Sequence, residues 1–390
     1  MTSFQERLIF KFARKSGIIA IDRMLSERKV IRLSYDDFQS IREGSWCSSS
    51  SSSSSTAKCE KLEHPTDHLI NGLELLEFVC EFQLSVRISR MIGGLVSDSA
   101  TNKVSERDYA SLIASSIRSA AATNLIDVAP DFIDYFELIC TRALLLPHRQ
   151  PSHKDGSGVL ALDDLIECPV LRAFVRFLDA DMHAVFDHSE GSSRFHPMSV
   201  RNIHRQYLQL DTDKSGLLSA DELSDFGKKR AFNPAGREPT HDLTGAFVAQ
   251  VFCQVPSFDG ELDYKAYIDF ALVMADKTSL AALRFFWEVL DFQKQGFLDT
   301  FTLDFFLRSL VEKIQSHAGE DEEEASKLPS VGELRTQILD IVAPATPGRV
   351  TWQDLCRCRV GHMVVRVLTD YVAYHVYEST GGRLPVPALP

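Results

Sequence analysis

Residues Asp211 to Glu222 read D-T-D-K-S-G-L-L-S-A-D-E, and this stretch has the spacing of a calcium-binding EF-hand loop. Calcium prefers about six to eight oxygen ligands, which such a loop supplies at fixed positions. Gly216 stands at the sharp turn, because glycine adopts a positive φ without steric cost. We expect the ligands to be Asp211, Asp213, Ser215, the carbonyl of Leu217, Ser219 through a water molecule, and both carboxylate oxygens of Glu222.

Apolar residues on both sides of the loop follow the spacing of a helix face. Those before it are Val200, Ile203, Tyr207 and Leu210, and those that begin the stripe after it are Leu223 and Phe226. The alternative is a turn whose acidic side chains only face solvent, which requires neither the ligand spacing nor the two stripes. The sequence therefore predicts a helix, a calcium-binding loop and a second helix.

An EF-hand usually buries its apolar face against another hand, so further copies are expected. The pattern is a turn residue, an aliphatic residue soon after it, and two apolar residues at helical spacing beyond. It recurs with turn residues at Asn102, Gly158, Gly216, Gly260, Gly296 and Gly348. The aliphatic residues are Val104, Leu160, Leu218, Leu262, Leu298 and Val350. We expect a mainly α-helical fold of tandem EF-hand helix-loop-helix pairs, one hand intact and several degenerate, with an N-terminal helical region.

The other copies have lost calcium ligands. The position of Glu222 is taken in them by Asp108, Asp164, Ala266, Thr302 and Asp354. The loop from Asp291 to Thr302 keeps Asp291 and Asp299 but has glutamines between them, which predicts a weak or vestigial second site. The loop around Gly260 begins at Val255 and Pro256, whose side chains cannot coordinate a metal, and we expect it to pair with the intact loop.

Composition restricts the functional classes. A chain of 390 residues with 44% hydrophobic content can bury several cores. Its net charge of -12 argues against nucleic acid as the main partner, and no apolar run predicts a membrane span. The eight cysteines lack a C-x-x-C pair, which favours a reducing compartment; Cys356 and Cys358 are interpreted as packed or surface thiols rather than as a metal site. The basic run Lys228–Arg230 is interpreted as a solvated helix end, with a peptide or partner contact as the alternative.

The domain organisation follows from composition and from the repeats. Residues 1–47 are predicted to form an amphipathic helical segment, for which a transit peptide is the alternative, and the serine-rich residues 48–60 are predicted to form a linker that phosphorylation could regulate. We expect a helical domain with degenerate repeats at 61–195, the EF-hand pair with the intact loop at 196–278, a degenerate pair at 279–380, and a disordered tail at 381–390. The acidic run Glu320–Glu324 is interpreted as a solvated insertion between helices.

Catalytic motifs are absent from the sequence. It contains no P-loop, no G-x-S-x-G elbow, no H-E-x-x-H and no kinase signature, so no catalytic residue is predicted. His183 and His188 lack the helical spacing of a metal pair and are interpreted as packed or surface residues. An enzyme with an appended EF-hand module would need its catalytic domain in the N-terminal part, where no such chemistry is recognisable. The sequence predicts a regulator, not an enzyme.

Three stretches resemble a known family. They are R-N-I-H-R-Q-Y-L-Q-L-D from Arg201, D-G-E-L-D-Y-K-A-Y-I-D-F-A-L from Asp259, and F-F-W-E-V-L-D-F-Q-K-Q-G-F-L from Phe285. Together with the intact loop they resemble the B''-type regulatory subunits of protein phosphatase 2A, in particular the gamma-type branch that includes the plant TONNEAU2/FASS protein. The chain departs from the better calcium-binding relatives at Gln293, Gln295 and Thr302.

The resemblance implies a non-catalytic, calcium-responsive subunit that binds the phosphatase scaffold and catalytic subunits and directs the choice of substrate or location. It also implies centrosomal or microtubule-associated partners, and a location in the cytoplasm, the nucleus, the centrosome or basal body, or the cortical cytoskeleton. The alternative is a stand-alone EF-hand adaptor of the cytoskeleton without a phosphatase. The large ligand-free body weighs against a simple sensor.

Overall fold

The structure is a computed structural model. It describes residues 32–34, 69–71, 84–95, 103–123, 125–148, 158–178, 193–228, 239–318 and 328–380. The predicted N-terminal segment apart from 32–34, the serine-rich linker, the histidines at 183 and 188, the end of the basic run, the acidic run and the tail lie outside these residues. The chain divides into one unit of Met1–Val128 with Ser152–His196 and another of Ala129–Pro151 with Pro197–Pro390. The predicted domain boundaries stay predictions.

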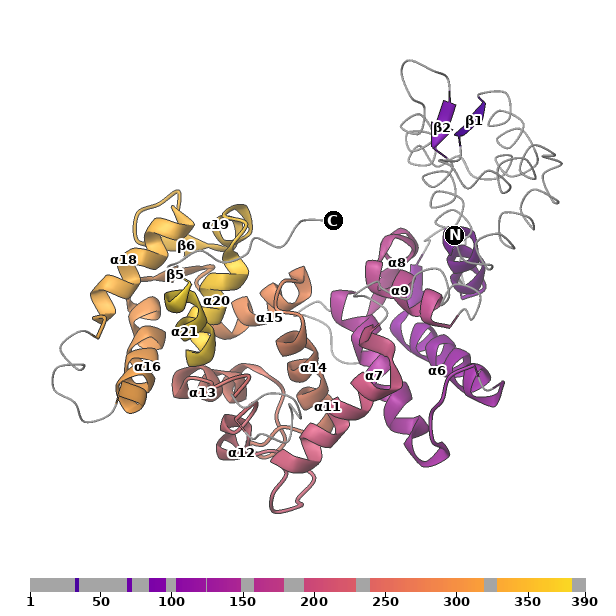
Figure 1. Ribbon diagram of the computed structural model, residues 1–390, viewed down its shortest axis with the longest axis horizontal. Coiled ribbons are helices and arrows are strands. Elements are labelled where there is room, and N and C mark those ends of the chain that lie inside the picture. Colours follow the sequence, from indigo (N-terminus) through magenta and orange to yellow (C-terminus); the bar gives the residue numbers. More distant parts are fainter. Residues whose placement is uncertain are drawn as a thin grey trace. The chain divides into compact units, whose positions relative to one another are not determined.

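The described residues of the first unit contain two short antiparallel strand pairs. Strand β1 (Arg32–Ser34) pairs with β2 (Leu69–Asn71), and β3 (Lys103–Ser105) pairs with β4 (Val159–Ala161). Within the described ranges, the helical elements of this unit are a helix over residues 84–93, α6 (Glu106–Ala122), α8 (Leu162–Glu167), α9 (Pro169–Phe177) and the 3-10 turn η3 (Ser193–Phe195) (Figure 1).

In its described residues, the second unit is a succession of helices with one further strand pair, β5 (Phe297–Asp299) with β6 (Arg349–Thr351). It begins with α7 (Ile133–Leu145), flanked by the 3-10 turns η1 (Pro130–Phe132) and η2 (Leu146–His148). The other helices are α11 (Pro197–Leu210), α12 (Ala220–Ser224), α13 (Gly245–Gln254), α14 (Tyr264–Ala275), α15 (Leu280–Leu290), α16 (Thr300–Ala318), α18 (Val331–Val342), α19 (Trp352–Arg357), α20 (Gly361–Thr369) and α21 (Tyr371–Ser379).

Many of these helices begin at a residue whose side chain accepts a backbone amide of the first turn. This contact satisfies one of the amides that a helix start leaves unpaired. The capping residues include Ser105, Ser219, Thr244, Asp263, Ser279, Ser330, Thr351 and Asp370. The starts of the helices are therefore encoded locally by short polar side chains.

The aliphatic residues of the repeated pattern lie opposite one another in pairs. Val104 faces Leu160, Leu218 faces Leu262, and Leu298 faces Val350. In the central pair the amide of Leu218 donates to the carbonyl of Leu262 at 2.8 Å, and the reverse bond is 2.9 Å long. All six side chains are buried. The predicted fold of tandem EF-hand pairs is confirmed, including the pairing of the ligand-free loop at Gly260 with the intact loop.

The second unit is also held together by a buried ion pair between α7 and α14. Arg142 Nε donates to Asp269 Oδ1 at 2.8 Å, and its Nη2 donates to Asp269 Oδ2. The Asp269 side chain is only 3% exposed. Because a lone buried charge is costly, each partner depends on the other.

Another buried carboxylate, that of Asp370, connects the central hand pair to the C-terminal helices. It lies 2.6 Å from His241 Nδ1 and 3.3 Å from Lys277 Nζ, and it accepts the amide of Asp242 at 3.0 Å. Burial raises the pKa of Asp370, but the His241 hydrogen bond and the Lys277 charge outweigh this effect and bring it to about 2. Asp242 in turn contacts the amine of Lys313 on α16 at 2.7 Å.

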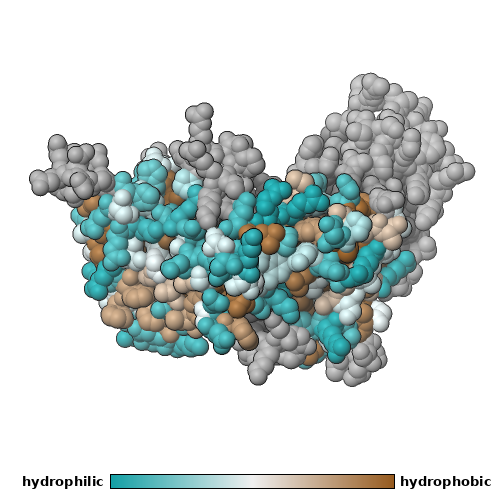
Figure 2. Space-filling model, turned by 90° about the horizontal axis from the view of Figure 1, so that it is seen from below, coloured by the Kyte–Doolittle hydropathy of each residue, from teal (hydrophilic) through white to brown (hydrophobic). Residues whose placement is uncertain are grey.

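The surface of the described residues is mixed. Figure 2 shows mostly hydrophilic residues on the face it presents, with smaller hydrophobic areas between them. The exposed large hydrophobic residues include Met198, Leu208, Phe258 and Phe301. Single exposed hydrophobic side chains are ordinary on protein surfaces and indicate no partner by themselves.

Replacing Asp269 by alanine should lower the free energy of unfolding by about 3 kcal/mol, because the buried charge of Arg142 then loses this carboxylate. The matched control is Asp304→Ala on α16, whose carboxylate contacts Arg335 at 2.7 Å but is 20% exposed. That change should cost less than about 1 kcal/mol. Urea unfolding of both variants measures the difference. Equal losses would contradict the role given to the buried pair.

Candidate metal centre

The predicted calcium loop connects α11 to α12. The amide of Asp211 donates to the carbonyl of Tyr207 at 2.9 Å, so Asp211 continues the hydrogen bonding of α11. The chain then turns through Lys214 and Gly216, which have φ values of 59° and 78°. A Cβ atom at Gly216 would meet nothing within 4 Å, so the positive φ, not lack of space, favours glycine there.

Three of the predicted ligands gather at this loop. Asp211, Asp213 and Glu222 each offer one carboxylate oxygen, and these atoms lie within 4.8 Å of one another. Among the described residues, no other group of three or more acidic, histidine or cysteine side chains is placed to hold a metal ion. The arrangement concentrates negative charge at the junction of two helices, as calcium coordination requires.

Asp211 supplies the observation that best fits a cation. Its Oδ2 atom accepts the amide of Gly216 at 3.1 Å, whereas its Oδ1 atom is buried without a hydrogen-bond partner. A buried carboxylate oxygen that accepts nothing is costly, and an ion bound at the loop would satisfy it. The donor set, carboxylates with hydroxyl and carbonyl oxygens, is the one that Ca²⁺ prefers.

Glu222 is held by the chain on both of its oxygens. Oε1 accepts the amide of Thr212 at 2.8 Å, and Oε2 accepts the amide of Ser219 at 3.0 Å. Burial raises the pKa of Glu222, but these hydrogen bonds and those of the two hydroxyls lower it to about 2. The side chain is therefore a carboxylate at neutral pH.

The structure gives Ser219 a role beyond that of a predicted ligand. Its hydroxyl accepts the amide of Glu222 at 3.3 Å, and the Glu222 carboxylate accepts the Ser219 amide in return, which is a capping box at the start of α12. The sequence signal was present, because a serine followed three residues later by glutamate is typical of this motif. The other predicted ligands, Ser215 and Leu217, contact each other through the Ser215 hydroxyl and the Leu217 carbonyl at 3.1 Å.

The loop at Asp291 differs in the state of its first carboxylate. Asp291 Oδ1 accepts the amide of Gln295 at 3.0 Å and Oδ2 accepts that of Gly296 at 2.9 Å, so both oxygens are engaged. Asp299 accepts the amide of Thr302 at 2.8 Å, a contact at the start of α16. This difference from Asp211 supports the prediction of a weak or vestigial site, which stays a prediction.

Aromatic residues around the incoming helix form a cluster that the sequence indicated only as an apolar stripe. The ring of Tyr207 lies 4.7 Å from that of Tyr264 and 5.2 Å from that of Tyr267. His204 Nδ1 lies 2.8 Å from the hydroxyl of Tyr264, and burial lowers the pKa of His204. The cluster packs α11 against α14 next to the loop.

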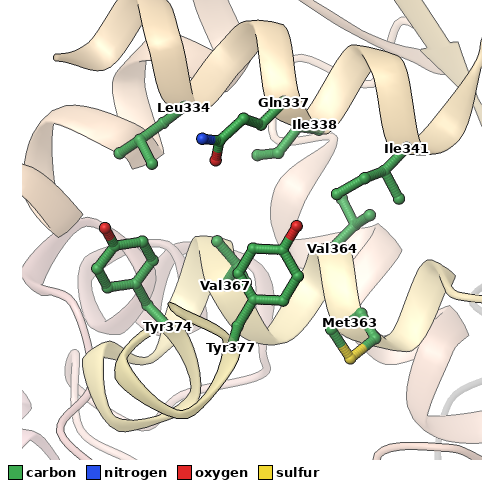
Figure 3. A pocket seen from close by; sticks show the side chains of 9 residues that line it. All are labelled: Leu334, Gln337, Ile338, Ile341, Met363, Val364, Val367, Tyr374 and Tyr377. Atoms are coloured by element: carbon green, nitrogen blue, oxygen red, sulfur yellow. The ribbon is translucent and has the colours of Figure 1, made fainter. Parts of the chain in front are cut away.

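An apolar pocket between α18, α20 and α21 is a poorer candidate for a site. Figure 3 shows its lining, which includes Leu334, Ile338, Met363, Val367, Tyr374 and Tyr377. Gln337 and the two tyrosine hydroxyls are its polar groups, and no acidic or basic side chain lines it. The pocket therefore offers no metal ligand set and no acid-base pair.

The structure defines a class of protein: tandem EF-hand pairs in which one loop brings three carboxylates of the predicted calcium ligand set together. Comparison with known proteins points to a particular family. The chain is similar to the gamma form of the B'' regulatory subunits of serine/threonine-protein phosphatase 2A from Xenopus tropicalis, with 32% identity over 57% of this chain and 45% of the relative. The human gamma form is 30% identical over 57% of this chain and 44% of its own length.

A more distant relative and a solved structure also carry the name of protein phosphatase 2A or of its B'' subunits. The probable B'' regulatory subunit TON2 of Arabidopsis thaliana is 23% identical over 65% of this chain and 50% of that protein. A solved chain described as a PP2A PR70 holoenzyme, with the label diCa, has a TM-score of 0.57 and 17% identity, and it covers 74% of this chain and 98% of that one. This likeness supports the fold alone. No family model matches the chain.

The resemblance to B'' regulatory subunits inferred from the sequence is confirmed, since the curated relatives carry that name. The chain spans about half the length of the curated relatives it matches. In the part of the chain that the structure describes, no helix is long and apolar enough to cross a membrane.

Changing Glu222 to glutamine should weaken calcium binding by at least roughly tenfold, because the loop loses a charged ligand at its closing position. The matched control is Glu333→Gln, since Glu333 forms the same capping box with Ser330 but faces no loop carboxylates. Calcium titration against a chromophoric chelator measures both. A Glu222→Gln variant that binds calcium as tightly as the parent would refute the ligand assignment.

Proposed function

We propose that the chain acts as a non-catalytic regulatory subunit of protein phosphatase 2A of the B'' type, and that it binds one calcium ion at residues 211–222. The observation that carries the proposal is the similarity over 223 residues to proteins named as B'' regulatory subunits. The partners would be the scaffold and catalytic subunits of the phosphatase. The buried, unpartnered Oδ1 atom of Asp211 supports calcium as the ligand.

A calcium ion would supply a positive charge that links the end of α11 to the start of α12. Contacts within the chain would carry the restraint on the calcium loop to neighbouring helices. Leu218 lies inside the loop and pairs with Leu262, so the position of the loop is tied to α14, which follows the second loop. Residue Asp269 on α14 then continues the contact to α7 through Arg142.

A second series of contacts connects the end of α12 to the C-terminal helices. Phe226, two residues beyond α12, stacks on the ring of His241 with centroids 5.4 Å apart. His241 contacts the carboxylate of Asp370, which caps the start of α21. The loop carbonyl of Gly227 accepts the amide of Thr240 at 3.0 Å beside this stack. Ordering of the calcium hand would therefore stabilise the arrangement of both hand pairs.

The alternative function, a stand-alone EF-hand adaptor of the cytoskeleton, is not favoured, because the curated relatives are named as phosphatase regulatory subunits. The predicted centrosomal or microtubule-associated partners, and the predicted location in cytoplasm, nucleus or centrosome, stay predictions.

The proposal is tested by binding the full chain to purified scaffold and catalytic subunits of the phosphatase, once in calcium and once in chelator. We expect a ternary complex, with a higher yield in calcium. The Glu222→Gln variant should give the chelator yield under both conditions, whereas Glu333→Gln should behave as the parent. The absence of a complex with the parent chain in either condition would contradict the regulatory-subunit proposal.

A further inference from the structure

The four hands of the second unit share one contact at the start of each loop. The amide of the first loop residue donates to the carbonyl one helical turn earlier, at 2.8 to 2.9 Å. The pairs are Asp211 with Tyr207, Val255 with Val251, Asp291 with Trp287, and Ala343 with Leu339. Only the hand with the calcium ligand set has a hydroxyl-bearing side chain at the earlier position of these four.

That hydroxyl reaches into the loop. The side chain of Tyr207 donates to the carbonyl of Gly216 at 2.5 Å. The amide of Gly216 donates to Asp211 Oδ2 at 3.1 Å. The turn at Gly216 is therefore held on its carbonyl side by Tyr207 and on its amide side by the first predicted ligand.

The contact holds the peptide unit that leads into Leu217. Because a peptide unit is planar, the carbonyl of Gly216 and the amide of Leu217 orient together. That amide donates to the hydroxyl of Ser215 at 3.2 Å, which fixes the other end of the same plane. The Leu217 carbonyl, the only backbone ligand that the loop pattern predicts, belongs to the next peptide unit, whose Leu218 amide donates to the carbonyl of Leu262 at 2.8 Å. The Tyr207 contact therefore fixes the peptide unit on one side of Leu217, and the loop pair fixes the unit on the other side.

Tyr207 is itself held firmly. The residue is 6% exposed, and its ring packs against Tyr264 and Tyr267. Burial, together with the negative charges of Asp211, Asp263 and Glu222, raises the pKa of Tyr207 to about 12. The hydroxyl thus remains a hydrogen-bond donor at neutral pH.

We propose that Tyr207 is a positioning residue of the calcium site, whose hydroxyl holds the loop in the shape that presents the Leu217 carbonyl to the ion. The inference rests on the proposed calcium binding at residues 211–222. Preorganisation of this kind raises affinity because less chain freedom is lost when the ligand binds. The hands that carry Val251, Trp287 and Leu339 lack such a hydroxyl and have incomplete ligand sets.

The test is Tyr207→Phe in the full chain, which removes the hydroxyl and keeps the ring. The dissociation constant for calcium should rise about 3- to 10-fold, which corresponds to the loss of one hydrogen bond. The matched control is Tyr267→Phe, whose hydroxyl donates to the carbonyl of Ile203 at 3.2 Å, away from the loop. That variant should keep the parent affinity. Competition with a chromophoric chelator measures all three proteins.

Urea unfolding in chelator separates positioning from general packing. A purely structural role would lower the free energy of unfolding without changing calcium affinity. Parent-like affinity in Tyr207→Phe, or an equal loss in Tyr267→Phe, would overturn the inference while the calcium site of the parent stands. A parent chain that binds no calcium at millimolar concentration would overturn the site and this inference with it.

Discussion

Pairing between loops is the constraint on which the described hands depend. A single helix-loop-helix hand exposes an apolar face, and in this chain each paired loop contributes one buried aliphatic residue to a short antiparallel contact. Leu218 and Leu262 make this contact through two hydrogen bonds, although only one of their loops carries the predicted calcium ligands. The degenerate loops are retained in the fold because they complete these pairs, whether or not they bind a metal.

Polar side chains that would coordinate calcium in an intact hand serve as structural contacts in the degenerate ones. Asp354 stands at the position of Glu222, and it accepts the amides of Thr351 and Ala345. Asp299 accepts the amide of Thr302 in the same way. Glu222 in the intact loop accepts amides on both of its oxygens in the same way. A loop can thus lose calcium ligands and still keep its shape, because the closing carboxylate makes the hydrogen bonds of a helix start in both kinds of hand.

The repeated pattern made much of the fold predictable from the sequence. The turn residues and the aliphatic residue after each gave the loop pairs, because both are fixed by backbone geometry that leaves few alternatives. The contacts of Asp269 and Asp370 could not be predicted, since their partners lie 127 and 129 residues away in the chain. At the site, ligand spacing indicated Asp211, Asp213 and Glu222, whereas the link from Tyr207 to Gly216 depends on how a ring packs in three dimensions.

The central claim is that the fold carries hands of two kinds, one that holds calcium and others that only complete pairs. Native mass spectrometry of the full chain in calcium measures the number of bound ions most directly. The account predicts one calcium ion per chain, which is displaced by chelator. Two ions would contradict the assignment of the loop at Asp291 as vestigial, and none would contradict the calcium site itself.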